Sequence, residues 1–262
     1  MVMSQRVVEG TPTWVAAEVL HIGAEAVATA GRWLDGDAIL KERRPRGYRH
    51  PSLDRRLSSA RLTAEARILS RLAASPLPVP TLLAIDAEAG WMIQSRMPGV
   101  PLFDPLRGAA DAPLGDSARS KPMFTSLGCF IRALHRRAVS HGDLTTHNIL
   151  WCPEAGLSLV DFGLGRLSPE LEICGLDLQV LSECLSASHP DHEGAMQAVL
   201  EGYTDDGSEV AFSQPSDSTT VADDAGGGAA EAGSPVGGAP AHSAAEVVAR
   251  FEAIRGRVRY HG

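Results

Sequence analysis

A spaced set of polar residues in the middle of the chain constrains the fold more than any other feature. His141 precedes Asp143, Asn148 follows five residues later, and Asp161 opens the triplet D-F-G, 18 residues beyond Asp143. An aspartate and an asparagine one turn apart, followed by a strand and a second aspartate, are typical of a site that holds a metal ion and a reacting hydroxyl. A chance meeting of a capping aspartate, a buried asparagine and a surface aspartate is the alternative, and the spacing disfavours it.

Two charged residues upstream complete the pattern. Lys41 lies in the predicted strand AILKE, and Glu65 follows 24 residues later on a predicted helix. Phosphoryl transfer from ATP concentrates negative charge on phosphate oxygens, and a strand lysine held by a helix glutamate can neutralise that charge. Either residue could instead be an ordinary surface group. Their order relative to Asp143 favours a phosphoryl-transfer site.

Each residue of this set has an expected role. Lys41 binds the inner phosphates of ATP, and Glu65 holds the lysine in place. Asp143 is the expected catalytic base, which orients the incoming hydroxyl or accepts its proton. Asn148 and Asp161 are expected to hold Mg²⁺ through oxygen atoms, because Mg²⁺ is a hard cation.

Hydrophobic periodicity predicts a mixed α+β chain. Residues 15–43 read as strand, turn, strand, and residues 81–97 as a hairpin around Glu88–Gly90. The segment LSLVDF is a further predicted strand, and residues 101–121, with several prolines, are expected to be irregular. Apolar residues at spacings of three and four predict helices at residues 52–73, 122–138, 176–187, 193–203 and 243–255.

The segment 205–245 differs in composition from the rest of the chain. Of the 24 residues 222–245, nine are Ala and six are Gly. Such a segment buries too little apolar surface to offset its ordering entropy, so we expect it to be disordered. It also belongs to an acidic region, since residues 167–249 hold 15 acidic residues and no Lys or Arg.

Basic residues gather before the catalytic set and at the chain end. Residues 41–71 hold ten basic and three acidic residues. This stripe could meet nucleic acid or an acidic partner, or it could be a solvated helix face.

Four cysteines without a C-x-x-C pair argue against a zinc site and a disulfide framework, and favour a reducing, intracellular compartment. No uncharged stretch is long enough to span a membrane.

Several short motifs are spread along the chain. They are G-A-E-A from Gly23, K-x-R-x-P-x-G-Y-R-H-P from Lys41, E-A-R from Glu65, H-G-D-L-T-T-x-N from His141, D-F-G-L from Asp161 and S-H-P from Ser188. On these motifs the chain resembles the small atypical protein kinases of the KEOPS (EKC) complex, over residues 18–204 and 246–262.

The resemblance implies a compact two-lobed protein-kinase-like fold without the activation segment and substrate-docking helices of ordinary protein kinases. Only 15 residues separate Asp161 from Asp177, and no A-P-E motif is present, which agrees with that expectation. The expected parts are an N-lobe at 14–95, a C-lobe at 96–204, the disordered acidic Gly/Ala-rich tract at 205–245, and a short helix with a basic tail at 246–262.

The resemblance also implies further site residues. Gly23, Ala24 and Glu25 are expected to bind the nucleotide, although Gly23 could merely turn a hairpin. Asp177 matches the buried aspartate that supports the catalytic loop. His141 is expected to bond within that loop rather than to transfer protons. Arginines of a basic tail are expected to reach a partner or tRNA, and those of this chain are Arg255, Arg257 and Arg259.

As to function, the resemblance implies a serine/threonine kinase or ATPase that uses ATP and Mg²⁺ in the cytoplasm and nucleus. Its expected partners are the Kae-type transferase subunit, the other KEOPS subunits and tRNA, in the complex that makes threonylcarbamoyladenosine in ANN-decoding tRNAs. Two alternatives remain. One is a scaffold that binds nucleotide without catalysis, and the other is a free-standing small-molecule kinase, which would need a larger substrate lobe after residue 177.

Overall fold

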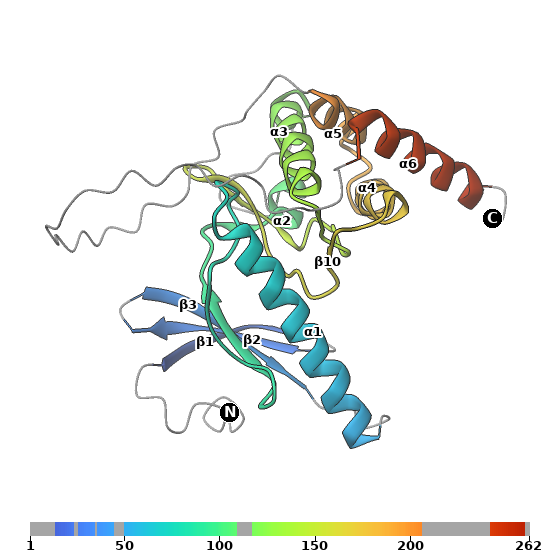
Figure 1. The fold of residues 1–262 in the computed structure, drawn as a ribbon. Helices are drawn as coiled ribbons and strands as arrows, with labels where there is room; N and C mark the ends of the chain where they lie inside the picture. Colours follow the sequence, from blue (N-terminus) through green and yellow to red (C-terminus); the bar gives the residue numbers. More distant parts are fainter. Residues whose placement is uncertain are drawn as a thin grey trace, which may run out of the picture.

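A five-stranded antiparallel sheet crossed by one long helix forms the N-terminal part of the protein (Figure 1). The structure, a computed structural model, describes residues 14–23, 26–34, 36–44, 50–108, 117–205 and 242–259. The sheet order is β1-β2-β3-β5-β4, with β1 Trp14–Ile22, β2 Ala26–Trp33, β3 Gly36–Arg43, β4 Leu82–Asp86 and β5 Trp91–Ser95. The helix α1 spans Pro51–Leu72 and begins at a proline, which suits a first helical position.

The strand β2 was not predicted. Residues 15–43 form three strands rather than a strand, a turn and a strand. The sequence of β2, AVATAGRW, is rich in small residues, so it lacks the alternation of large apolar and polar residues that signals a strand. Gly31 allows close packing here, because an added Cβ would lie 2.7 Å from the Trp14 ring. The expected hairpin, by contrast, is present as β4 and β5.

Helices dominate the C-terminal part (Figure 1). They are α2 Phe103–Leu106, α3 Ser117–Arg136, α4 Leu171–Ser188, α5 Ala195–Thr204 and α6 Ala244–Arg259. Two small sheets accompany them, β6-β8-β9 and β7-β10, built from β6 Val100–Pro101, β7 Val139–Ser140, β8 Ile149–Cys152, β9 Gly156–Leu159 and β10 Arg166–Leu167. The loop between β7 and β8 carries the motif H-G-D-L-T-T-H-N.

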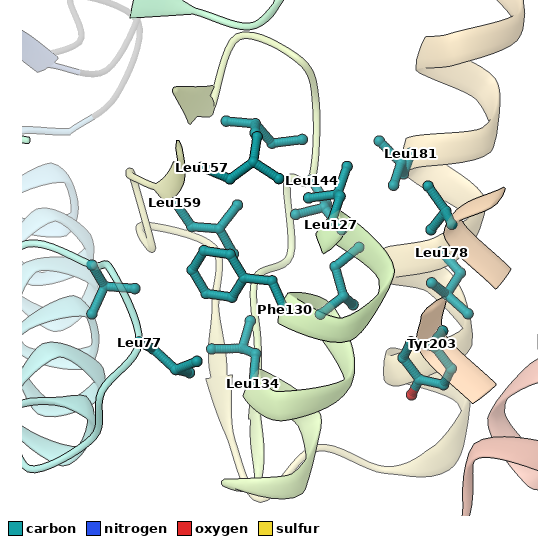
Figure 2. Packing of buried hydrophobic residues seen from close by; sticks show 14 of the residues in the cluster. Leu77, Leu127, Phe130, Leu134, Leu144, Leu157, Leu159, Leu178, Leu181 and Tyr203 are labelled. Carbon is teal, nitrogen blue, oxygen red and sulfur yellow. The ribbon is translucent and has the colours of Figure 1, made fainter. Parts of the chain in front are cut away.

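The core of the C-terminal part is centred on α3. Figure 2 shows Phe130 and Leu134 of α3 beside Leu159 of β9, and all three side chains are fully buried. Helix α5 packs closely on α3, because a Cβ at Gly128 would collide with the Val199 carbonyl. This packing gives the β7–β8 loop a rigid base, since Leu144 of that loop is also buried in the core.

Several predicted element ends differ from the structure. Helices α3 and α4 each begin five residues earlier than predicted, at Ser117 and Leu171, and α6 continues to Arg259 rather than 255. The expected strand at LSLVDF ends at Leu159, and the region predicted to be irregular contains β6 and α2. Most of the tract predicted to be disordered, residues 206–241, lies outside the described residues. The predicted α+β, kinase-like fold is confirmed.

Candidate active site

A buried lysine and glutamate join the sheet to α1. Lys41 lies on β3, which is flanked by β2 and β5, and its Nζ donates to Glu65 Oε1 over 2.5 Å. Both side chains are buried. Burial alone would lower the pKa of the lysine, but the Glu65 and Asp161 carboxylates outweigh it and raise that pKa above its ordinary value. Lys41 therefore carries a fixed positive charge.

Asp161 lies on the other side of the same ammonium group. Lys41 Nζ donates to Asp161 Oδ1 over 2.9 Å, and the Gly163 N–H donates to that oxygen over 3.3 Å. Partial burial would raise the pKa of Asp161, but Lys41 lowers it to about 2. The backbone at Asp161 is left-handed, with φ of 65°, which turns the carboxylate toward Lys41 while Phe162 is buried. The side chain stays 52% exposed, so it can still bind a ligand.

The β7–β8 loop brings Asp143 and Asn148 together. The Asn148 amide nitrogen donates to the Asp143 carbonyl and to Asp143 Oδ2, both over 2.9 Å. The Asn148 carbonyl accepts from the Val160 N–H, which joins this loop to the residue before Asp161. Within the described chain, no hydrogen bond occupies the Asn148 amide oxygen, which is the atom that a cation needs.

Asp177 of α4 supports this loop from beneath. Its carboxylate accepts from the His141 N–H over 2.7 Å and from the Gly142 N–H over 2.8 Å. Burial would raise the pKa of Asp177, but hydrogen bonds from His135 and His141 lower it. His141 is fully buried, and its Nε2 lies 3.0 Å from the Val160 carbonyl while its Nδ1 lies 3.3 Å from the Asp143 nitrogen. His141 thus bonds within the loop.

Comparisons with known proteins identify the family. The EKC/KEOPS complex subunit BUD32 of Chaetomium globosum is 35% identical over 197 residues, which cover 64% of this chain and 74% of that protein. The EKC/KEOPS complex subunit Tp53rkb of Mus musculus is 30% identical over 190 residues, or 71% of this chain and 78% of that protein. The chain belongs to the BUD32 family. The resemblance inferred from the motifs is confirmed.

Two more similarities accompany this BUD32 family membership. A probable bifunctional tRNA threonylcarbamoyladenosine biosynthesis protein of Methanothermobacter thermautotrophicus is 34% identical over 187 residues, which cover 71% of this chain but 33% of that protein. Residues 46–170 match the lipopolysaccharide kinase (Kdo/WaaP) family.

The described helices include none long and apolar enough to cross a bilayer.

The glycine-containing turn of this BUD32-family chain is described only in part. Gly23 follows the end of β1, and its N–H donates to the Ala26 carbonyl over 2.9 Å. Ala26 pairs with Arg43 of β3, so the turn lies near the end of the strand that carries Lys41. Ala24 and Glu25 lie outside the described residues. Nucleotide binding by these three residues therefore stays a prediction.

The arginines expected in a basic tail belong to a helix as far as Arg259, and their contact with a partner or tRNA stays a prediction. Helix α6 continues through Arg255, Arg257 and Arg259. Arg257 Nη2 lies 3.0 Å from Glu172 Oε1 on α4, whereas Arg255 is exposed and the placement of the Arg259 side chain is not described. The buried face of this helix consists of Val247, Phe251 and Ile254, which lie within the helix predicted at 243–255.

Two polar residues of the site were missed in the sequence. His135, at the end of α3, lies with Nε2 3.1 Å from Asp177 Oδ2 and with Nδ1 2.8 Å from the Tyr203 hydroxyl. Both side chains are buried, and burial raises the pKa of Tyr203. His135 lies 42 positions from Asp177 and 68 positions from Tyr203 in the sequence. No short-range spacing in the sequence indicates contacts between residues so far apart.

Proposed function

We propose that this chain is an ATP- and Mg²⁺-dependent serine/threonine protein kinase or ATPase, and that it is the kinase subunit of a KEOPS-type complex. The observation that carries the proposal is the meeting of Lys41, Glu65 and Asp161 at one buried ammonium group. The bonded pair Asp143 and Asn148 supports it. The expected lobes, 14–95 and 96–204, would enclose the nucleotide between them.

The residues present fit magnesium and ATP. The Asp161 carboxylate and the Asn148 amide offer oxygen ligands, which Mg²⁺ prefers, and Lys41 offers a permanent positive charge for phosphate oxygens. ATP would supply the phosphoryl group, with its charge offset by Mg²⁺. The backbone of residues 94–98 is the proposed contact for adenine.

The chain's own residues would then act by position and charge. Lys41 orients the phosphates, and Glu65 keeps the ammonium group at a fixed place on β3. Asp143 orients the attacking hydroxyl, either of a serine or threonine side chain or of water, and takes up its proton. Asn148 keeps Asp143 in place through its amide nitrogen. Because these groups are held before substrate arrives, little reorganisation is needed at the moment of transfer.

The substitution Asp161→Asn tests the catalytic part. It removes the charge that a metal ion needs and should abolish ATP hydrolysis and autophosphorylation, while the circular dichroism spectrum and the thermal midpoint stay near those of the wild type. Hydrolysis at the wild-type rate in this variant would contradict the assignment. A wild-type chain that binds nucleotide but never turns it over would instead be the scaffold.

The names of the relatives support membership of a KEOPS-type complex, and the specific partners are those that the motif resemblance implies. We infer that the chain binds a Kae-type threonylcarbamoyltransferase subunit and other KEOPS subunits, and that it supports modification of ANN-decoding tRNAs. The arginines of α6 remain candidates for contact with tRNA or the transferase, but from a docked helix rather than a free tail. Purification of the tagged chain followed by mass spectrometry tests the proposed partners, and absence of the transferase subunit from the purified sample would contradict this proposal.

Location in the cytoplasm and nucleus stays a prediction, which cell fractionation would test.

A further inference from the structure

Arg43 approaches the same buried carboxylate as Lys41. Glu65 Oε1 binds Lys41 over 2.5 Å, and its second oxygen, Oε2, lies 3.8 Å from Arg43 Nη2. The Arg43 and Glu65 side chains are 10% and 1% exposed. Residues i and i+2 of a strand point to the same face, so both cations reach Glu65 from β3. The glutamate is therefore enclosed by two cationic groups.

The Arg43 guanidinium also borders the D-F-G turn. A Cβ added at Gly163 would lie 3.3 Å from Arg43 Nη2, 3.1 Å from Asp161 Oδ1 and 3.6 Å from Glu65 Oε2. Gly163 thus leaves room for three charged groups that come from β3, α1 and the turn. The Arg43 backbone is fixed as well, because its N–H donates to the Gly90 carbonyl over 2.8 Å.

The charges of this cluster balance only when Arg43 is counted. Lys41 and Arg43 are positive, and Glu65 and Asp161 are negative. Lys41 is shared between both carboxylates, over 2.5 and 2.9 Å. A lysine that also binds phosphate oxygens shares its charge among more acceptors, and a buried carboxylate with too little counter-charge is costly. Arg43 lies 3.8 Å from the second oxygen of Glu65, so its positive charge can offset the Glu65 carboxylate while Lys41 binds phosphate.

We propose that Arg43 is a positioning residue of the phosphoryl-transfer site, which holds Glu65 and the Asp161–Gly163 turn in place while Lys41 binds phosphate. The inference rests on the proposed function. It assigns Arg43 no contact with the reacting atoms. Its effect passes through Glu65, so the two residues should be energetically coupled.

The first test compares Arg43→Met with Arg43→Lys and with the control Arg56→Met, an exposed arginine on α1. Arg43→Met should lower kcat for ATP hydrolysis at least tenfold and change KM less. Arg43→Lys, which keeps the charge, should retain more activity than Arg43→Met, and the control should match the wild type. Equal losses in the Lys and Met variants, or a lower thermal midpoint with unchanged kcat, would overturn the proposal.

A double-mutant cycle with Glu65→Gln tests the route of the effect. If Arg43 acts through Glu65, Arg43→Met should change kcat by less than twofold when Glu65→Gln is already present. A full tenfold loss in that background would show that Arg43 acts elsewhere, and would overturn the proposal.

A second measurement needs no turnover. Without nucleotide, the Gly163 amide should exchange its hydrogen faster in Arg43→Met than in Arg56→Met, because the turn loses its neighbour. Unchanged exchange would overturn the role of Arg43. A wild-type chain that fails to bind ATP would contradict the proposed function alone, since the exchange of Gly163 can still be compared in that case.

Discussion

At the scale of single residues, the site depends on a few buried charges, each with a partner. Asp177 is an example, because it is 1% exposed and accepts two backbone N–H groups and one from His135. Both oxygens of the Asp177 carboxylate accept hydrogen bonds. An asparagine would place an NH₂ donor where one of these oxygens lies, and this donor would face an N–H donor.

The change Asp177→Asn should therefore lower the free energy of unfolding by about 1–3 kcal/mol and lower kcat for ATP hydrolysis. Urea denaturation and steady-state kinetics measure both. The exposed Glu252→Gln on α6 is the matched control and should leave both near the wild-type values. If the two variants behave alike, the support of the loop does not depend on the Asp177 charge.

At the scale of elements, α6 shows how an end segment is held. Ser243 and Glu246 form a reciprocal capping pair at its start, with Ser243 Oγ 2.7 Å from Glu246 Oε2. Apolar residues on one side pack on α4, while Arg250 and Arg257 both reach Glu172 over 3.2 and 3.0 Å. The capping pattern and the spacing of Val247, Phe251 and Ile254 were readable in the sequence. They agree with the helix predicted at 243–255, whereas Arg257 and Arg259 were expected in a tail and belong to the helix.

The apolar face should hold α6 more strongly than its ion pairs. Phe251→Ala empties a fully buried site and should lower the free energy of unfolding by about 3–5 kcal/mol. Glu172→Gln removes partly exposed ion pairs and should cost less than about 1 kcal/mol. Denaturant unfolding of the two variants checks the order. A larger loss for Glu172→Gln would mean that charge, rather than packing, docks this helix.

At the scale of the whole molecule, His189 joins three segments that are far apart in the sequence. It follows α4, and its Nε2 lies 3.0 Å from Thr146 Oγ1 in the β7–β8 loop. Its ring packs edge to face with Phe103 of α2, with 5.3 Å between the ring centroids. Burial first, and then unfavourable electrostatic interactions with His192, Arg107 and His147, lower its pKa from 6.5 to about 4. His189 is therefore neutral when the molecule is folded near neutral pH.

This shift predicts a pH dependence of stability. The unfolded chain binds more protons than the folded one between pH 6.5 and about 4, so the free energy of unfolding should fall as pH falls through that window. One such group contributes a slope of at most about 1.4 kcal/mol per pH unit. Denaturation at several pH values measures it. His189→Gln should flatten the slope and the exposed His50→Gln should not, whereas equal slopes in all three proteins would refute the assignment.

The sequence by itself determined the family and most of the elements, and it supplied the candidate site residues. His141, Asp143, Asn148 and Asp161 lie close together in the sequence, so their spacing can be read without knowledge of the fold. The long helix α1 and the hairpin of β4 and β5 were predictable for the same reason, because hydrophobic periodicity repeats over many neighbouring residues.

Only the tertiary structure decided which distant side chains meet. The strand β2 follows from packing between β1 and β3, where small residues fit against the Trp14 ring. Arg43 beside Glu65 and His135 beside Asp177 depend on how a strand and helices are packed, and this packing has no signature in the local pattern. Charges that must balance in a buried space are set by the three-dimensional neighbours of each group, and the chain acquires these neighbours only when it folds.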